Sequence, residues 1–292
     1  IGLANYLYLE GDQYYKEYDY RPFDTRKIFY FLPLITRHRY KIMKHFDKKN
    51  IGLISTRLLS SNNYLHSFVT DKLTDIGILS ARTSESGYIF PLYVYNGDSN
   101  ENQQTLDGKS IKSGKQPNFK EEFIEFIKDT YPNKEITPEE ILDYVYAILH
   151  SNNYRKKYQE FLKIDFPRIP FVKDYVKFKK LSELGKELID LHLMKTEFRS
   201  NIVKFEKKGS NTVDFIKYEN KKIFINKEQY FDNINEEIWA FFIGGYQVLD
   251  KWLKSRKNRG LSSKEIETFV KIVNILDATI KIMEKLNKIK ND

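Results

Sequence analysis

The sequence contains no cysteine in 292 residues. This absence excludes disulfide bonds, thiolate nucleophiles and zinc sites built on cysteine. A metal site would therefore need histidine or carboxylate ligands. The five histidines (His38, His45, His66, His150 and His192) show none of the helical i, i+4 spacing that brings two ligands together, so we expect packing or surface roles for them and no metal. The lack of cysteine is compatible with the cytoplasm, where we expect the protein to reside.

Long apolar runs are also missing. No uninterrupted stretch approaches the roughly 20 apolar residues that span a bilayer, which argues against a membrane protein. The first ten residues lack the basic and then apolar pattern of a secretory signal, and position 1 is Ile, so we expect the chain to be a fragment of a longer polypeptide. A hydrophobic content of 41% is enough for the core of one large domain or two small ones.

Positive charge is present in excess. The formal net charge of +9 predicts a field that attracts polyanions, nucleic acid first and anionic lipid second. A biased composition with a solvated lysine surface explains the same number, so charge alone does not decide the function.

Four short segments of the first hundred residues favour strands, because they are rich in aromatic and branched residues and are bounded by turn formers. They are residues 6–9, 28–31, 51–55 and 88–95. Between Asn96 and Asn118 the apolar residues give way to Gly, Asp, Asn, Gln, Ser and Lys, the composition of an exposed loop. We therefore divide the chain into a β-rich part, residues 1–115, and a helical part, residues 116–292.

Helix signals dominate the second half. Thr137 precedes a first-turn proline and a Glu three residues later, and Ser262 repeats the capping pattern with Glu265, ahead of a helix of about seven turns. Leucines at helical spacing predict another helix over residues 181–191, and a third resumes near Ile234. Residues 213–216 and 223–225 predict a hairpin that turns near Asn220. The sequence thus predicts an α+β fold, β-rich and then mainly helical, with one hairpin and a long terminal helix that packs within the chain rather than on another chain.

Catalytic motifs are missing from this pattern. An amino-methyltransferase needs an Asn/Asp-Pro-Pro-aromatic turn and a Gly-rich cofactor turn, and neither occurs. The adjacent Gly244 and Gly245 lie among helix-like residues, so we expect them to serve close helix packing. Asp214 with Glu219 and Lys221 is a superficial match to a metal-dependent nuclease. We expect a chain that binds and has no catalytic residues.

Arginine and asparagine residues near aromatic side chains are the candidates for binding DNA, because Arg grips phosphates or guanine and Asn pairs with adenine. Three groups lie in the first half: Arg21 and Arg26; Arg37, Arg39, Lys41 and Lys44; and Arg57, Asn62 and Asn63. A fourth group precedes the terminal helix: Lys254, Arg256, Lys257 and Arg259.

Each group also has an ordinary structural explanation. Arg21 and Arg26 could form internal ion pairs with Asp24 that fix a turn, and the fourth group could consist of solvated cations that complement a helix end. The group from Arg37 to Lys44 has one nearby acid, Asp47, which leaves most of its charge available to phosphates.

Several segments in a fixed order resemble a known family. They are residues 20–26 (YRPFDTR), 50–57 (NIGLISTR), 68–71 (FVTD), 90–95 (FPLYVY), 147–151 (AILHS), 154–155 (YR), 161–170 (FLKIDFPRIP) and 244–256 (GGYQVLDKWLKSR). In this order they resemble the C-terminal specificity region, or target-recognition region, of type ISP restriction-modification enzymes. In that family the preceding part carries an adenine-N6 methyltransferase, in some members behind a nuclease and a helicase-like motor.

The resemblance implies a function in sequence-specific recognition of duplex DNA for an adenine-N6 DNA methyltransferase. It implies two partners, double-stranded DNA and an upstream methyltransferase domain of the same polypeptide. S-adenosylmethionine is implied for the parent enzyme, with no cofactor in this chain. The alternatives from the residues are a stand-alone metal-dependent nuclease fragment and a subunit-assembly domain.

Overall fold

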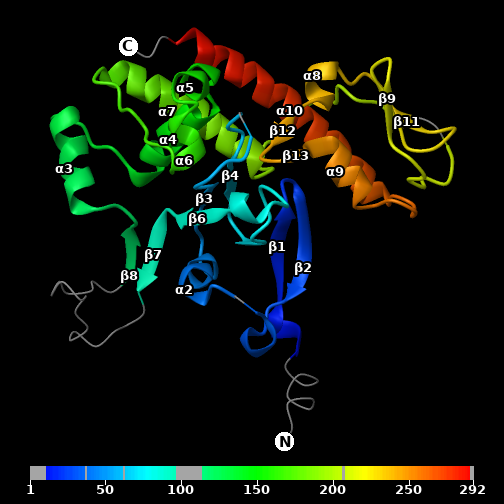
Figure 1. The fold of residues 1–292 in the computed structure, drawn as a ribbon, viewed down its shortest axis with the longest axis horizontal. Helices are drawn as coiled ribbons and strands as arrows, with labels where there is room; N and C mark the ends of the chain where they lie inside the picture. The colour runs from blue at the N-terminus through cyan, green and yellow to red at the C-terminus, as the bar shows by residue number, and fades with distance from the viewer. Residues whose placement is uncertain (1–10, 37, 62, 97–113, 206–207, 290–292) are drawn as a thin grey trace, which may run out of the picture.

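A computed structural model describes residues 11–36, 38–61, 63–96, 114–205 and 208–289 of the chain. Strands predominate before residue 118 and helices after it, as Figure 1 shows, so the predicted α+β fold is confirmed. Among these residues, no helix combines the length and the apolar character needed to cross a bilayer.

The N-terminal part contains three small sheets. The first has the order β2-β1-β5, the second β4-β3-β6, and the third pairs β7 with β8. Their bounds are β1 Tyr15–Arg21, β2 Asp24–Phe29, β3 Gly52–Ser55, β4 Ser67–Thr70, β5 Leu73–Thr74, β6 Tyr88–Pro91, β7 Tyr93–Asn96 and β8 Gly114–Pro117. Short helical turns lie between them: η1 Gly11–Tyr14, η2 Leu32–Leu34, α2 Tyr40–Met43, η3 Lys44–Phe46 and η4 Thr83–Glu85.

The helical part forms a layer against one end of these sheets (Figure 1). Its helices are α3 Glu121–Thr130, α4 Pro138–His150, α5 Asn152–Lys157, α6 Phe161–Ile164, α7 Tyr175–His192, α8 Glu236–Trp239, α9 Val248–Lys254 and α10 Ser263–Lys288. Its strands are β9 Lys217–Glu219, β10 Lys222–Phe224, β11 Tyr230–Phe231, β12 Phe242–Ile243 and β13 Tyr246–Gln247. The two capping boxes are present as predicted, at Thr137 with Glu140 and at Ser262 with Glu265.

Four predictions of secondary structure need comment. The strand expected at residues 6–9 lies outside the described residues. The segment 88–95 is two strands, because Leu92 donates its N–H to Ile51 and accepts one from Asn118 between them. The strand expected at 213–216 is wrong, since Val213 and Asp214 bond separately to Arg259 and Ile225; the first strand of the hairpin is β9. Its turn at Asn220 is confirmed.

The glycine pair was predicted to serve close helix packing, and the structure corrects this. Gly244 lies in the turn between β12 and β13 at φ +59°, and an added Cβ would lie 2.0 Å from the carbonyl oxygen of Leu79. Its N–H donates to the carbonyl of Leu65. The glycine therefore lets a hairpin of the helical part dock on the backbone of the β-rich part.

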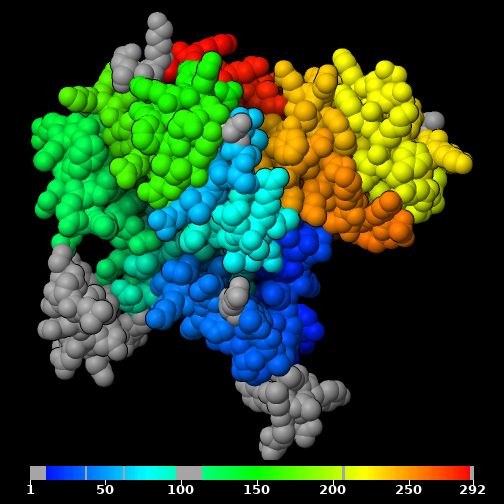
Figure 2. Space-filling view, in the orientation of Figure 1, coloured from blue at the N-terminus to red at the C-terminus, as the bar shows by residue number. Residues whose placement is uncertain are grey.

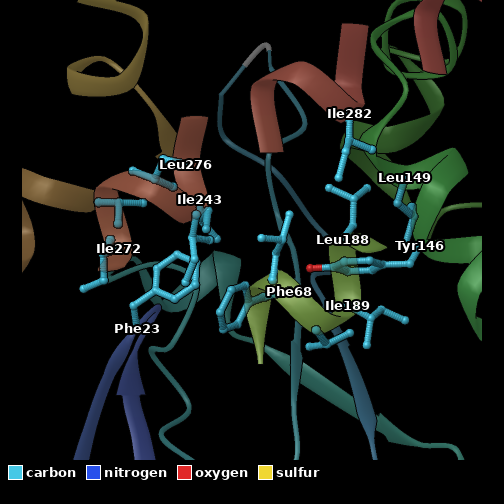
Figure 3. Packing of buried hydrophobic residues seen from close by; sticks show 14 of the residues in the cluster. Phe23, Phe68, Tyr146, Leu149, Leu188, Ile189, Ile243, Ile272, Leu276 and Ile282 are labelled. Carbon is cyan, nitrogen blue, oxygen red and sulfur yellow. The ribbon is translucent and has the colours of Figure 1, made fainter. Parts of the chain in front are cut away.

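One buried core joins the two parts. Figure 3 shows Phe23 and Phe68 of the β-rich part between Ile243 and Leu276 on one side and Tyr146 on the other. The long helix α10 packs on α7 and α4 of the same chain, which confirms its predicted intrachain packing. The domain boundary near residue 115 stays a prediction.

Helices α4 and α7 make the closest helix contact, and Gly185 permits it. A Cβ built there would lie 1.8 Å from the carbonyl oxygen of Asp143.

In an ordinary helix, Gly→Ala stabilises by about 1 kcal/mol. We expect Gly185→Ala to reverse this sign and to lower the free energy of unfolding by about 2 kcal/mol, because the helices must separate. Equilibrium denaturation checks this, with Gly11→Ala, where nothing lies within 4 Å, as the neutral control. A stabilised Gly185→Ala protein would contradict this packing.

Candidate nucleic-acid interface

Five exposed cations lie on α2 or directly before and after it, in the lobe that projects at the bottom of Figure 2 and whose elements Figure 1 labels. They are Arg39, Lys41, Lys44, Lys48 and Lys49, and we call them the α2 cluster. Arg37, which was predicted with them, lies outside the described residues. Within the described part of the chain, no member of the cluster forms an ion pair. The one acid in this stretch, Asp47, is occupied by Lys16 at 3.0 Å.

Hydrogen bonds and burial fix the backbone beneath this cluster. Met43 and His45 are buried, and His45 accepts the N–H of Tyr95 at its Nδ1 (3.0 Å). Burial, with Lys44 nearby, lowers the pKa of His45, so its ring is neutral and remains an acceptor. The hydroxyl of Tyr30 donates to the carbonyl of His38 (2.8 Å). The cations therefore extend from a held turn.

Arg39 begins this turn in the left-handed conformation, with φ 49° and ψ 38°. This conformation costs a residue with a Cβ about 1 kcal/mol, and glycine adopts it without that cost. The side chain of Arg39 is exposed and has no ion-pair partner among the described residues.

A hollow of about 390 Å³, lined by both charged and apolar side chains, continues the α2 cluster toward the helical layer. Its lining residues are Lys49, Asn50, Ile51, Asp71, Leu92, Tyr93, Lys115, Glu139 and Lys195. Both carboxylates are engaged: Asp71 lies 3.0 Å from Lys72 and 3.5 Å from Lys195, and Glu139 accepts the Tyr93 hydroxyl at 2.7 Å. Lys115 lies over the Tyr93 ring at 3.6 Å. These lysines were missed because residues 49, 115 and 195 are brought together only by the fold.

The loop after β3 carries another predicted group, at the far end of β3 from the α2 cluster. Arg57 is exposed, and its Nε lies 3.6 Å from Asp165. Asn63 is exposed, and Asn62 lies outside the described residues. Because the two groups lie at opposite ends of one strand, the structure keeps them apart.

Buried Glu85 holds the start of this loop. Its carboxylate accepts the N–H of Ser60 (3.0 Å) and the hydroxyls of Ser60 and Ser80, and it lies 3.3 Å from Nε2 of His66. Burial opposes its charge, yet these hydrogen bonds hold the pKa of Glu85 down at about 2. Burial lowers the pKa of His66, which is therefore a neutral donor to Glu85. No local sequence pattern marks this carboxylate as a functional or structural residue.

Arg21 and Arg26 each contact an acidic side chain and an aromatic ring of the same chain. Arg21 donates to Asp75 at 2.8 Å and stacks on the ring of Tyr20 at 4.0 Å. Arg26 donates to Asp24 at 2.7 Å and also stacks on Tyr20, at 3.9 Å. The Asp24 pair is the one that the sequence offered as an alternative, whereas the acid for Arg21 is 54 positions away.

The fourth group forms an ion-pair network between distant segments. Arg256, with its side chain 11% exposed, contacts Asp24 at 2.9 Å and Glu265 at 3.0 Å, and it stacks on Trp252 at 3.4 Å. Arg259 contacts Glu265 at 2.6 Å. The hydrogen bond from Arg259 keeps the pKa of Glu265 at about 2.

The two lysines of this group lie at its solvent edge. Lys254 pairs with Asp250 at 2.7 Å, and Lys257 is exposed and has no acid partner among the described residues. Most of the charge of this group is therefore neutralised within the chain.

An apolar groove of about 520 Å³ lies along α5, α6 and the extended segment 165–170. Phe161 and Ile164 on its edge are 69% and 66% exposed. Its charged lining residues, Asp165 and Arg168, lie 3.9 Å apart. The groove lacks the unpaired cations that a phosphate backbone would need.

The residues of the alternative nuclease site are on the surface. Asp214 and Glu219 are exposed, and Glu219 pairs with Lys217 at 2.8 Å. No three His, Asp or Glu residues are grouped to hold a metal ion anywhere in the described ranges.

The chain is similar to known proteins along almost its whole length. Residues 10–285 match the family model of the Type ISP C-terminal specificity domain. No curated protein matches the sequence.

Several solved structures share the fold, including the following three. The ATP-dependent Type ISP restriction-modification enzyme LlaBIII bound to DNA has a TM-score of 0.73 at 21% identity, over 96% of this chain and 19% of that chain. A nuclease-deletion mutant of the Type ISP enzyme LlaGI in complex with a DNA substrate mimic has a TM-score of 0.67 at 20% sequence identity. The match covers 94% of this chain and 24% of that chain. The DrdV–DNA complex has a TM-score of 0.73 at 18% sequence identity, and the match covers 94% of this chain and 28% of that chain. The chain thus spans about a quarter or less of the length of most of these proteins.

We expect Arg256→Gln to destabilise the fold by about 3 kcal/mol, because buried Asp24 loses a partner and Trp252 loses its stacked guanidinium. Lys257→Gln removes the same charge one position away from an exposed side chain and should leave stability unchanged. Denaturant midpoints of the two variants check this. Equal midpoints would show that the network does not hold the two segments together.

Glu85 should also make stability depend on pH. Its pKa of about 2 lies below the unfolded value of 4.5, so its contribution is complete above pH 4.5 and is lost as pH falls toward 2. Glu85→Gln should lower the free energy of unfolding at neutral pH by about 3 kcal/mol and flatten its decline between pH 4.5 and 2. Exposed Glu187→Gln is the control, and an unchanged acid profile in Glu85→Gln would refute the assignment.

Proposed function

The chain belongs to the Type ISP C-terminal specificity domain family, and on this premise we propose that it recognises duplex DNA for an adenine-N6 methyltransferase of a restriction-modification system. The relatives with this fold are complexes with DNA or with a DNA substrate mimic, which supports a DNA partner. Catalysis and binding of S-adenosylmethionine belong, in this proposal, to another domain of the same polypeptide, acting in the cytoplasm.

The glycine turn of this chain does not fit the cofactor. Gly244 and Gly245 are the one adjacent glycine pair in the sequence, and the space at Gly244 is filled by the backbone of Leu79. No step of the methyl transfer is therefore assigned to these residues.

The α2 cluster carries the proposal. The chain has 40 acidic residues, yet the five cations of the α2 cluster form no ion pair with any described residue. Arg21, Arg26, Arg256 and Arg259, in contrast, each pair with an acidic side chain of the same chain. Unpaired cations on a projecting lobe suit the phosphates of a duplex, which supply the missing negative charge. Arg57, Asn63 and Lys257 are further contacts in this proposal.

Binding to duplex DNA should therefore fall steeply with salt. Replacing both Lys41 and Lys44 with Gln should reduce the magnitude of the slope of log K against log salt by about 1.8, since each phosphate contact contributes about 0.9. Fluorescence anisotropy of a labelled duplex over a salt titration measures this slope.

The matched control changes Lys264 and Lys285 to Gln. Both are exposed on α10 without a described ion pair, and α10 lies on the opposite side of the molecule from α2 in Figure 1. Its slope should equal that of the unmodified protein. Binding without salt dependence, or an equal loss in both double variants, would refute the α2 cluster as the phosphate contact.

A further inference from the structure

We propose that α2 enters the major groove and that Tyr40 and Ile42 contact bases there, while the lysines beside them hold phosphates. This inference rests on the proposed function, because it assigns base contacts within the same DNA interface. It gives a role to two side chains that charge alone does not explain.

Two large side chains of α2 with apolar surface are exposed. Tyr40 is 43% exposed and Ile42 is 38% exposed, whereas Met43 is buried. Successive residues of an α-helix turn by about 100°. With Met43 directed inward, Lys41 points outward and Tyr40 and Ile42 flank it. The turn thus presents a cation between two apolar side chains.

A phosphate can accept a hydrogen bond from the Tyr40 hydroxyl, but an oxyanion offers no apolar surface to Ile42 or to the ring of Tyr40. Base edges in the major groove do offer one, most clearly the methyl group of thymine. A groove also places phosphates on both of its sides, where Lys41 and Lys44 would meet them. DNA is therefore the partner that matches both kinds of side chain at once.

A protein partner fits this surface less well. Asp47, the acid nearest to the α2 cluster in sequence, forms an ion pair with Lys16, so it does not neutralise a cation of the cluster. A protein would have to bring several carboxylates around an apolar contact, whereas every duplex carries phosphates beside its bases.

The dimensions and rigidity of the turn suit insertion. A helix with its side chains is about 10–12 Å across, close to the 12 Å width of the major groove and about twice that of the minor groove. The N–H of Tyr40 donates to Nδ1 of His38 at 3.1 Å, and the carbonyl of His38 is held by Tyr30. The turn is thus ordered before DNA arrives, which reduces the entropy lost on binding.

The experiment selects bound duplexes from a randomised pool and sequences them, using the whole chain. The test variant carries Tyr40→Ser and Ile42→Ser, and the comparison variant carries Lys41→Gln and Lys44→Gln. We expect the apolar variant to lose preference at one or more base positions by roughly fivefold or more, with an unchanged salt slope. The lysine variant should keep the base preference and lose salt slope.

A second measurement tests the apolar contact directly. Where the selected sequence contains thymine at the affected positions, uracil lacks the methyl group. Uracil should weaken binding of the unmodified protein and have no effect on the apolar variant. A second pair, Tyr40→Gln with Ile42→Gln, retains helix propensity if the serine pair disturbs the turn.

The outcomes separate this inference from the proposed function. Salt-dependent binding with no base preference, or a preference that survives both apolar variants, overturns the inference and leaves phosphate gripping in place. A change in oligomeric state without a change in base preference means that the side chains contact protein, and it also overturns the inference. No binding to duplexes at low salt overturns both proposals.

Discussion

The buried carboxylate of Asp24 is the interaction on which the arrangement of this molecule depends. It accepts hydrogen bonds from Arg26 two residues away and from Arg256 at the other end of the chain. Trp252 reinforces the junction by donating its indole N–H to the carbonyl of Phe23 at 3.3 Å. An aspartate that is 2% exposed needs such partners to offset the hydration that it loses on burial. Through it the β1–β2 hairpin, and the lobe that bears α2, is anchored to α9 and α10.

This anchoring divides the positive charge of the chain into two kinds. Arginines with planar, directional donors form ion pairs within the chain. Arg21, Arg256 and Arg259 each engage a carboxylate, and Arg21 and Arg256 also stack on aromatic rings. The cations of the α2 cluster are mostly lysines, which are strongly hydrated and remain in solvent. Net charge is therefore a poor guide to a binding surface until the ion pairs within the fold are subtracted.

Local chemistry was enough to predict much of the fold. Thr137 and Ser262 each predict the start of a helix, because a capping box needs only four consecutive residues. Asn220 predicts a turn, because asparagine tolerates a positive φ. Where the determinant is a tertiary contact, prediction was wrong. The turn at Gly244 is decided by Leu79, 165 positions earlier, and a helical interpretation of its flanking residues had no access to that contact.

The candidate site divides in the same way. The exposed cations from Arg39 to Lys44 were identifiable because few acids are near them in sequence. The pairing of Arg256 with Asp24 was not, because it spans 232 positions, and neither was the support that Glu85 gives to the loop after β3. A buried carboxylate that organises a loop has no local signature, since its partners are ordinary serines.

In the proposed interface, the position of α2 lets one domain combine general and selective contacts with a duplex. Phosphates repeat along every sequence, so cations on flexible side chains meet them whatever the bases are, whereas apolar contacts discriminate only if they are held at a defined depth in the groove. In this proposal the hydrogen bonds of His38 set that depth by fixing the turn, which Arg39 begins in a left-handed conformation, and the lysines keep the freedom to follow the backbone. Affinity and selectivity then depend on different residues of one helical turn, so substitutions at Tyr40 and Ile42 could change the preferred sequence without weakening the hold on DNA.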